Sequence, residues 1–276
     1  MRIAVSSDLH LDLNHAEIAN FITQQVDYLT TMKVDYYFSL GDMFNDFAKT
    51  EEYFKQLQQQ LPTTQVFYLA GNHDMLKNVT YNQLENLADP HYLHNHFIDL
   101  PKTNWRVIGN NGWYDYSFSQ YYGFPDKVAR WKKAYWIDRN ISQPMSDQAR
   151  MINVLTQVRQ QLTAAQISGK QVLFMTHFAP EAVLLPQKIP SQRKRRRMWE
   201  MVKAMMGSQK LGDLLAEFPV VRQVFYGHLH YAPALTTING IAYRNCAVGV
   251  QRKNRGTWQD KSLLNQWISR LYFTQL

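Results

Sequence analysis

The sequence predicts a protein of the α/β class, and two observations lead to this prediction. Short β-rich apolar runs recur along the chain, and segments with the apolar spacing of helices lie between them. Alternation of strands and helices is typical of α/β domains. The runs are almost continuously apolar, as expected for strands that are covered on both faces. In sheets of this class ligands bind outside the carboxyl ends of the strands, so we expect a functional site there.

Polar motifs follow five of the apolar runs, which places these motifs at the ends of predicted strands. The runs are residues 3–5, 36–40, 66–70, 172–175 and 224–226. The motifs that follow them are Asp8-Leu9-His10, Gly41-Asp42, Gly71-Asn72-His73-Asp74, Thr176-His177 and Gly227-His228-Leu229-His230. We expect Gly41, Gly71 and Gly227 to let the backbone turn sharply at these strand ends.

Two segments between the runs have the pattern of amphipathic helices. Apolar side chains recur every three or four residues over positions 18–29 and 151–162, which is the spacing of one helix face. Ser146 is expected to cap the second helix at its N-terminus, and Gly169 is expected to end it.

We expect a single folded domain that comprises residues 1–276. Apolar residues make up 45% of the chain and charged residues 19%, which argues against gross disorder. Cys246 is the single cysteine, so we expect a small buried apolar residue and no disulfide or thiolate metal cluster. No stretch approaches the roughly 18 apolar residues of a membrane span, and the N-terminal apolar run is too short for a secretory signal. We therefore expect a cytoplasmic protein and leave its oligomeric state open.

Two segments between the motifs are candidates for selecting a substrate. Residues 112–145 are rich in Trp, Tyr and Phe without a sustained period, and they form either a cap or insertion over the site or a loop packed on the core. Arg193–Arg197 is a run of basic residues in a chain of net charge +8. Such a run is most often a solvated helix face. A basic surface also favours anionic partners, including phosphate esters, nucleic acid and membrane surfaces.

A separate cluster of histidines lies in the segment His91-Tyr92-Leu93-His94-Asn95-His96, whose spacing could suggest a metal site. No predicted strand precedes this segment, and Asp89-Pro90 breaks the chain before it. We expect a polar surface turn here.

Side chains with oxygen or imidazole ligand atoms are gathered in the five strand-end motifs. The candidate metal ligands are Asp8, His10, Asp42, Asn72, His177, His228 and His230. Carboxylate, amide and imidazole ligands together suit divalent Mn, Fe, Zn, Ni or Co. Seven ligands exceed what one ion usually takes from a protein, but they suit two ions if one carboxylate bridges them. Two ions about 3.5–4 Å apart can hold a hydroxide between them and clamp a phosphoryl group.

In this order the five motifs resemble those of the calcineurin-like metallophosphoesterases, whose pattern is Asp-x-His, Gly-Asp, Gly-Asn-His-Asp/Glu, His and Gly-His-x-His. The resemblance spans residues 8–230. It implies a four-layer sandwich of two facing β-sheets flanked by helices. It also implies one metal ion held by Asp8, His10, Asp42 and His230, and a second held by Asp42, Asn72, His177 and His228, with Asp42 bridging.

The resemblance assigns His73 and Asp74 to catalysis. His73 then faces the substrate, where it stabilises the phosphoryl charge or protonates the leaving oxygen, and Asp74 orients or polarises its ring. Many relatives place an Asp, often followed by Arg, shortly after Gly-Asp, whereas this chain has Met43-Phe44-Asn45-Asp46. The roles that the family gives to groups around the metal ligands are therefore not assigned to residues 43–46 of this chain.

The implied function is that of a phosphoesterase with two divalent metal ions, in which a metal-bridging hydroxide attacks the phosphorus of a phosphate ester. Family analogy leans slightly toward small phosphodiesters or nucleotides. A nuclease acting on single-stranded nucleic acid is one alternative, because stacked aromatics and arginines would suit it. These lie about fifty residues apart in the sequence, however, and no nucleic-acid module is recognisable. A non-catalytic scaffold for protein binding is the other alternative, although it could dispense with His73 or several ligands, all of which this chain keeps.

Overall fold

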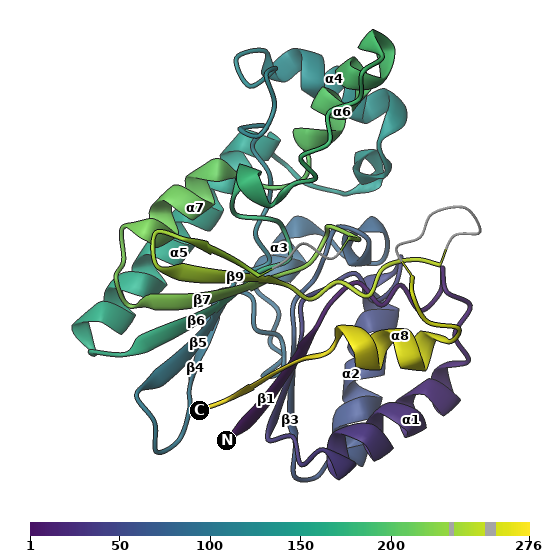
Figure 1. Cartoon of the computed structure of the whole chain (residues 1–276), viewed down its shortest axis with the longest axis vertical. Helices are drawn as coiled ribbons and strands as arrows, with labels where there is room; N and C mark the ends of the chain where they lie inside the picture. Colours follow the sequence, from purple (N-terminus) through teal and green to yellow (C-terminus); the bar gives the residue numbers. More distant parts are fainter. Residues whose placement is uncertain (232–234, 252–257) are drawn as a thin grey trace.

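Two β-sheets face each other at the centre of the computed structural model, and helices cover the outer face of each sheet (Figure 1). The structure describes residues 1–231, 235–251 and 258–276. This arrangement confirms the predicted α/β sandwich of four layers. Among the described helices, none has both the length and the apolar character that crossing a membrane requires.

The first sheet contains three of the five predicted strands. Its order is β10-β1-β2-β3, in which β1, β2 and β3 run parallel and β10 is antiparallel to β1. The strands are β1 (Arg2–Ser6), β2 (Tyr36–Ser39), β3 (Gln65–Tyr68) and β10 (Tyr272–Gln275). The carboxyl ends of the three predicted strands therefore lie at the same end of the sheet.

The second sheet contains the other two predicted strands. Its order is β4-β5-β6-β7-β9-β8, in which the four central strands run parallel. The strands are β4 (His96–Asp99), β5 (Trp105–Gly109), β6 (Gln171–Met175), β7 (Val221–Tyr226), β8 (Thr236–Ile238) and β9 (Ile241–Asn245).

Helices α1, α2 and α8 lie along the first sheet, and α5 and α7 lie along the second (Figure 1). The two helices predicted from periodicity are α1 and α5. The Ser146 hydroxyl accepts a hydrogen bond from the Ala149 N–H, and Gly169 follows α5 with a φ of +62°, as predicted. The bounds are α1 (Ile18–Thr31), α2 (Phe47–Gln60), α3 (Tyr81–Glu85), α5 (Asp147–Ile167), α7 (Gln209–Ala216) and α8 (Leu263–Arg270), with short 3₁₀ turns η1 (Asp74–Leu76) and η3 (Ala182–Leu184).

An apolar layer fills the space between the two sheets. Ile3 and Phe38 from the first sheet pack in one cluster with Val107 and Leu173 from the second, and all four side chains are buried. Cys246 is fully buried in the same cluster, which confirms its predicted role as an apolar core residue. Burial raises the pKa of its thiol to about 12, so the thiol stays neutral. This packing holds the carboxyl ends of the parallel strands of both sheets at one end of the sandwich.

The histidine-rich segment after β3 contains turns, as its sequence predicted, and His96 is exposed, but His94 does not lie at the surface. His94 is buried, with its Nε2 3.0 Å from Glu85 Oε1, and its Nδ1 accepts a hydrogen bond from the Asn111 N–H at 3.1 Å. These partners lie nine and 17 residues away along the chain. The prediction failed because it considered only neighbouring residues, whereas the fold supplies the buried partners.

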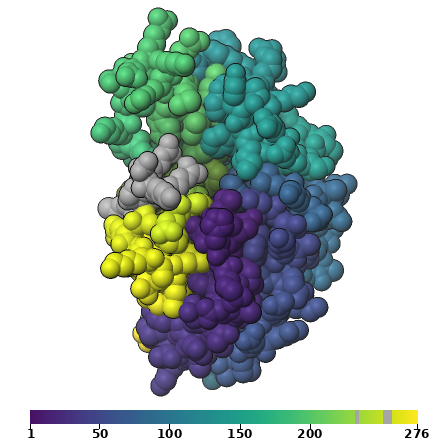
Figure 2. All heavy atoms as spheres, turned by 90° about the vertical axis from the view of Figure 1, so that its right-hand side faces the viewer, coloured from purple at the N-terminus to yellow at the C-terminus, as the bar shows by residue number. Residues whose placement is uncertain are grey.

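Two segments, residues 117–141 and 186–206, form a lobe that rises above the sheets (Figure 1). We call it the upper lobe. It contains α4 (Pro125–Tyr135), the short turn η2 (Ile137–Asn140) and α6 (Arg193–Lys203). In the space-filling view the teal α4 segment and the green α6 segment lie side by side at one end of the molecule (Figure 2). The fold therefore brings the aromatic segment and the basic run together, although they are far apart in the sequence.

Aromatic residues of the 112–145 segment divide between the core and the upper lobe. Trp113, Tyr114 and Tyr116 are buried, whereas Phe124 and Tyr135 are 64% and 73% exposed. The beginning of this segment therefore packs on the core, as one of the two predictions stated. The exposed aromatic residues belong to the upper lobe.

Asp147, at the start of α5, ties the upper lobe to the sandwich. Its buried carboxylate accepts hydrogen bonds from Lys132 Nζ of α4 at 2.7 Å, from Trp113 Nε1 at 2.9 Å and from the Tyr116 hydroxyl. Burial opposes ionisation of Asp147, but the charge of Lys132 and the hydrogen bonds hold its pKa below the usual range. Lys132 is buried as well, so each charge depends on the other.

We expect the substitution Asp147→Ala to lower the free energy of unfolding by about 3–5 kcal/mol, because it leaves the Lys132 ammonium buried without its partner. Urea denaturation followed by tryptophan fluorescence measures this change. The matched control is Asp27→Ala, which removes an exposed carboxylate from α1 and should change the free energy by less than about 0.5 kcal/mol. Equal losses in the two variants would show that the buried pair does not stabilise the fold.

Candidate metal centre

Predicted ligands from both sheets converge beyond the carboxyl ends of the strands. They come from the loops after β1 (Asp8, His10), β2 (Asp42), β3 (Asn72), β6 (His177) and β7 (His228, His230). Their ligand atoms form two groups, each within 4.8 Å, made of Asp8, His10, Asp42 and His230 and of Asp42, His177 and His228. Asn72 Oδ1 lies beside the second group, 3.3 Å from His177 Nε2. The structure therefore brings all seven predicted ligands together, and Asp42 belongs to both groups.

Backbone strain occurs at four of these ligand positions. Asp8, His10, Asp42 and His228 have φ angles of 57°, 43°, 56° and 63°. Such angles cost a residue other than glycine on the order of 1–3 kcal/mol and persist where the surroundings enforce them. Here the Asp8 N–H donates to the Gly41 carbonyl and the His10 N–H to the Asp42 carbonyl, each at 2.9 Å. These bonds hold the strained loops so that the side chains point toward one another.

Glycines at the strand ends serve two different purposes. Gly41 has a φ of +97°, which the predicted sharp turn requires. Gly71 and Gly227 lie outside that region of φ. A Cβ on Gly71 would lie 2.1 Å from Asp42 Oδ1, and one on Gly227 would lie 2.3 Å from Asp8 Oδ2. At these two positions glycine leaves room for a carboxylate, which corrects the expectation that it provides a turn.

In the first group two imidazoles face two carboxylates. His10 Nε2 lies 3.0 Å from His230 Nε2 and 3.6 Å from Asp42 Oδ2. His230 Nε2 lies 3.0 Å from Asp8 Oδ1. All four groups thus direct ligand atoms to one place, where a cation would interact favourably with each of them.

In the second group the protein fixes which ring nitrogen faces the site. His177 Nε2 lies 3.5 Å from Asp42 Oδ2 and 3.2 Å from His228 Nδ1. His177 Nδ1 donates to the Leu40 carbonyl at 2.9 Å, and His228 Nε2 donates to the Met205 carbonyl at 3.2 Å. A carbonyl can only accept, so the other nitrogen of each ring is left free to bind a metal ion.

Buried charge at this site requires a positive partner. Burial, with the negative charges of Asp8 and Asp74, raises the pKa of Asp42 well above its ordinary range. Burial also opposes ionisation of Asp8, but a hydrogen bond with His230 and the nearby histidines lower its pKa. Burial lowers the pKa of His10 far below its ordinary value. A neutral imidazole cannot balance the carboxylates, so the residues fit divalent cations.

Asn72 is oriented by Asp138 of the upper lobe, a contact that sequence analysis missed. Asp138 Oδ1 accepts a hydrogen bond from Asn72 Nδ2 at 2.8 Å, which leaves Asn72 Oδ1 directed toward His177. Asp138 is buried, and its Oδ2 accepts from the Tyr114 hydroxyl at 2.8 Å and from Trp136 Nε1 at 3.1 Å. Asn72 and Asp138 are 66 residues apart, so no local motif could have linked them.

His73 lies beside the metal ligands, and Asn45 holds its ring. His73 Nδ1 is 2.6 Å from Asn45 Oδ1, and its ring centroid is 4.6 Å from that of His10. Burial, together with charge on His230, lowers the pKa of His73 to about 4, so the ring is uncharged at neutral pH. Asn45 belongs to the stretch 43–46 in which this chain departs from the family pattern.

Asp74 does not orient the ring of His73, which corrects the expectation from their adjacency. Its carboxylate accepts hydrogen bonds from the N–H groups of Asp42 at 2.6 Å and Gly71 at 2.8 Å, and from the Thr50 hydroxyl at 2.7 Å. Burial raises its pKa to about 6, although these hydrogen bonds oppose the rise. The expectation was wrong because Asp74 begins a 3₁₀ turn, so neighbouring side chains point to different places. Asp74 instead holds the loop that carries Asp42.

A cavity of 580 Å³ opens over the ligands. Asp42, Asn72, His73, His228 and His230 line it from the sandwich. From the upper lobe it is lined by Tyr135, Trp136, Ile137, Trp199, Val202 and Met206. A ligand in this cavity can therefore contact the metal ligands, His73 and the upper lobe together.

Comparison with known proteins identifies the family. Residues 1–232 match the model of the calcineurin-like phosphoesterase family. The match covers most of the 276 residues, so the chain belongs to this family and is a metal-dependent phosphoesterase. Among curated proteins no sequence matches this chain.

Solved structures with a similar fold are distant in sequence. A dimetal phosphatase from Danio rerio is 12% identical with a TM-score of 0.49, over 89% of this chain and 86% of its own. GAP50, the anchor in the inner membrane complex of Plasmodium, is 14% identical with a TM-score of 0.48, over 99% of this chain and 78% of its own. Similarity at this level carries no argument about the site, which rests on the residues described above.

We expect Asp138→Ala to weaken binding of the more loosely held Mn²⁺ by about 10- to 100-fold, because Asn72 loses the group that orients its amide. Competition with a chromogenic chelator measures the affinity. Asp126→Ala is the matched control, since it removes an exposed carboxylate from the same lobe and should leave the affinity unchanged. If both variants bind Mn²⁺ as the wild type does, Asn72 does not depend on Asp138.

Proposed function

We propose that this protein hydrolyses a phosphate ester at a centre of two divalent metal ions. The observation that carries the proposal is the pair of ligand groups that share Asp42. Asp8, His10, Asp42 and His230 would hold one ion, and Asp42, Asn72, His177 and His228 would hold the other. Mn, Fe, Zn, Ni and Co all suit this mixture of carboxylate, amide and imidazole ligands.

When bound, the two ions supply Lewis acidity toward phosphoryl oxygens and lower the pKa of the water that attacks phosphorus. In the overall reaction the oxygen of water becomes bonded to phosphorus, one P–O ester bond breaks, and the released alcohol takes a proton. His73 lines the cavity beside Asp42, where the negative charge of a bound phosphate would favour the protonated ring, whose Nε2–H can donate a hydrogen bond to a phosphoryl or leaving oxygen. Asn45 keeps the ring in place, and Asp74 keeps the Asp42 loop in place.

Phosphodiesters and phosphomonoesters both fit this chemistry, and a slight lean toward small phosphodiesters or nucleotides rests on family analogy. A nuclease stays an alternative, since the basic α6 lies beside the aromatic α4 in the upper lobe. The distance between these segments in the sequence therefore no longer argues against nucleic acid as a substrate. A scaffold for protein binding is disfavoured, because it would not need the complete set of predicted ligands together with a His73 that lines the cavity beside them.

Asp42→Asn tests the bridging carboxylate. The variant keeps the side-chain volume but removes the negative charge that both ligand groups share, so we expect metal content below the wild-type stoichiometry and loss of most activity. Metal analysis of the purified protein and turnover of bis(p-nitrophenyl) phosphate with Mn²⁺ are the measurements. Full metal content with normal turnover would refute the bridge.

His73→Ala tests whether His73 acts on the substrate. We expect this variant to keep its metal content and to lower kcat by roughly 10²–10⁴-fold, the usual contribution of a positioned proton-transfer group. The loss should be smaller for esters with a good leaving group, which need little protonation. Metal content that falls together with activity would identify His73 as a ligand instead.

A further inference from the structure

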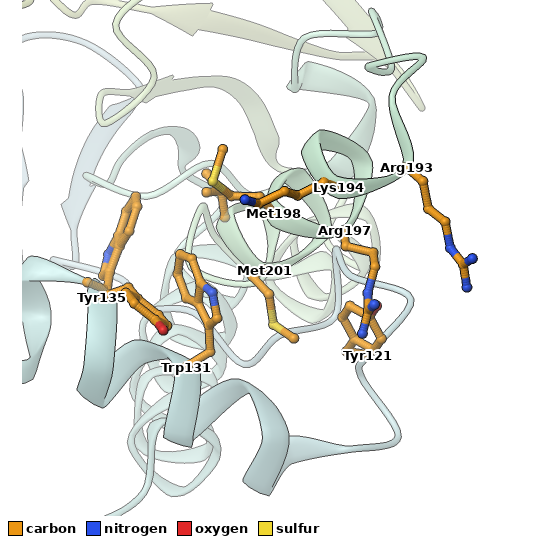
Figure 3. Close-up of a pocket in the computed structure, with 10 residues that line it drawn as sticks. Tyr121, Trp131, Tyr135, Arg193, Lys194, Arg197, Met198 and Met201 are labelled. Atoms are coloured by element: carbon orange, nitrogen blue, oxygen red, sulfur yellow. The ribbon is translucent and has the colours of Figure 1, made fainter.

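A second and larger cavity adjoins the cavity over the metal centre and lies between α4 and α6 of the upper lobe (Figure 3). We call it the lobe cavity, and its volume is 1090 Å³. Tyr135, Trp136 and Val202 line both cavities. The two cavities are therefore neighbours, and a ligand whose phosphate lies at the metal centre would reach the lobe cavity past these three side chains.

Aromatic and methionine side chains make up the walls of the lobe cavity. The ring centroid of Trp131 lies 5.6 Å from that of Tyr135 and 6.1 Å from that of Trp136. Met198 and Met201 of α6 lie across from these rings (Figure 3), and methionine adapts readily to irregular apolar ligands. The described lining includes no carboxylate or side-chain amide that could recognise the edge of a nucleobase. The cavity is therefore better suited to an apolar chain than to a base.

Large apolar side chains of the upper lobe are left uncovered by the rest of the protein. Tyr135 is 73% exposed and Met198 is 55% exposed, although both line the lobe cavity. Of the twelve large apolar side chains that are exposed in the described residues, six belong to the upper lobe. Apolar surface gathered beside a cavity is typical of a ligand-binding site.

Positive charge is concentrated in the same lobe. Its two segments contain 12 Lys and Arg residues and three Asp and Glu residues, a net charge of +9. The other residues together carry −1, because the net charge of the whole chain is +8. Arg193, Lys194 and Arg197 line the lobe cavity, and none of the three forms an ion pair with another described residue. These cations are available to an anionic ligand.

Helix α6 extends from the part of the lobe that lines both cavities to these cations. Val202 lines both cavities, whereas Arg193 lies nine residues earlier and lines only the lobe cavity. At a rise of 1.5 Å per residue this separation is about 13 Å along the helix. An extended apolar chain of about ten carbons covers a similar length.

We propose that the substrate is an amphiphilic phosphate ester, with its phosphate at the metal centre, its apolar body in the lobe cavity and a second anionic group beside Arg193 and Arg197. The proposal rests on the proposed phosphoesterase function and names the substrate class of that site. Each methylene group that becomes buried increases the affinity about fourfold. An ester with a long chain in the cavity should therefore bind more tightly than an ester with a short substituent.

Three phosphodiesters with the same p-nitrophenyl leaving group test the apolar part. Their second substituent is methyl, decyl or 10-carboxydecyl, and each is assayed with Mn²⁺ below its critical micelle concentration. We expect kcat/KM for the decyl ester to exceed that for the methyl ester at least about tenfold. Met198→Glu should reduce this ratio, whereas Ile152→Glu, which changes an exposed apolar residue on α5, should leave it unchanged.

Two double variants of the basic run test whether arginines recognise the second anionic group of the substrate. Each variant loses two positive charges, so the two can be compared directly. Arg193→Gln with Arg197→Gln removes two cations that line the lobe cavity, and Arg195→Gln with Arg196→Gln removes two that do not. The first pair should lower kcat/KM for the 10-carboxydecyl ester about tenfold relative to the decyl ester. The second pair should leave this ratio near its wild-type value.

Each other outcome has a definite meaning. Equal kcat/KM for the methyl and decyl esters overturns this proposal and leaves the phosphoesterase function intact. A clear preference for thymidine 5′-p-nitrophenyl phosphate over the decyl ester also overturns it, in favour of a nucleotide substrate. If no ester is hydrolysed, the proposed function fails. In that case tryptophan fluorescence measures the binding of methyl phosphate and decyl phosphate to the cavity without turnover. Equal affinity for the two phosphates overturns the proposal.

Discussion

The rest of the site depends on the buried carboxylate of Asp42, which belongs to both groups of ligand atoms. Its burial and the nearby negative charges of Asp8 and Asp74 disfavour ionisation, and burial lowers the pKa of the His10 and His177 imidazoles, which favours their neutral form. Such a cluster of carboxylates is stable only beside positive charge. We therefore expect metal binding and folding to be coupled, because the same buried groups that need a cation also connect the loops after β1, β2 and β6.

Facing sheets explain how five short motifs form one site. The apolar layer between the sheets fixes their separation, so loops from both sheets reach the same point. Close packing at that point leaves no room for a Cβ at Gly71 or Gly227. It also holds four ligand residues at positive φ, which is strain that the surrounding hydrogen bonds sustain. The Asp74 carboxylate contributes to this support by binding backbone N–H groups of two loops.

The upper lobe contacts the candidate metal centre and lines both cavities. Asp138 orients Asn72, a predicted metal ligand, and Trp136, which donates to Asp138, also lines both cavities. Asp147 and Lys132 connect α4 to the start of α5, so the position of the lobe is tied to the core. A ligand that displaces Trp136 would therefore act on the hydrogen bonds that hold Asn72.

The sequence by itself determined the fold class, the strand ends and which seven candidate ligands meet at one site, because each depends on local patterns: apolar runs, helical spacing and short polar motifs. It also placed Cys246 in the core and Ser146 at the start of α5. It could not identify Asp138 or Asn45 as the partners of Asn72 and His73, since these contacts span 66 and 28 residues. The same limit explains the wrong pairing of Asp74 with His73 and the unexpected burial of His94. Only the tertiary structure decided which residues of the basic run face a cavity, because a helix directs neighbouring arginines to different sides.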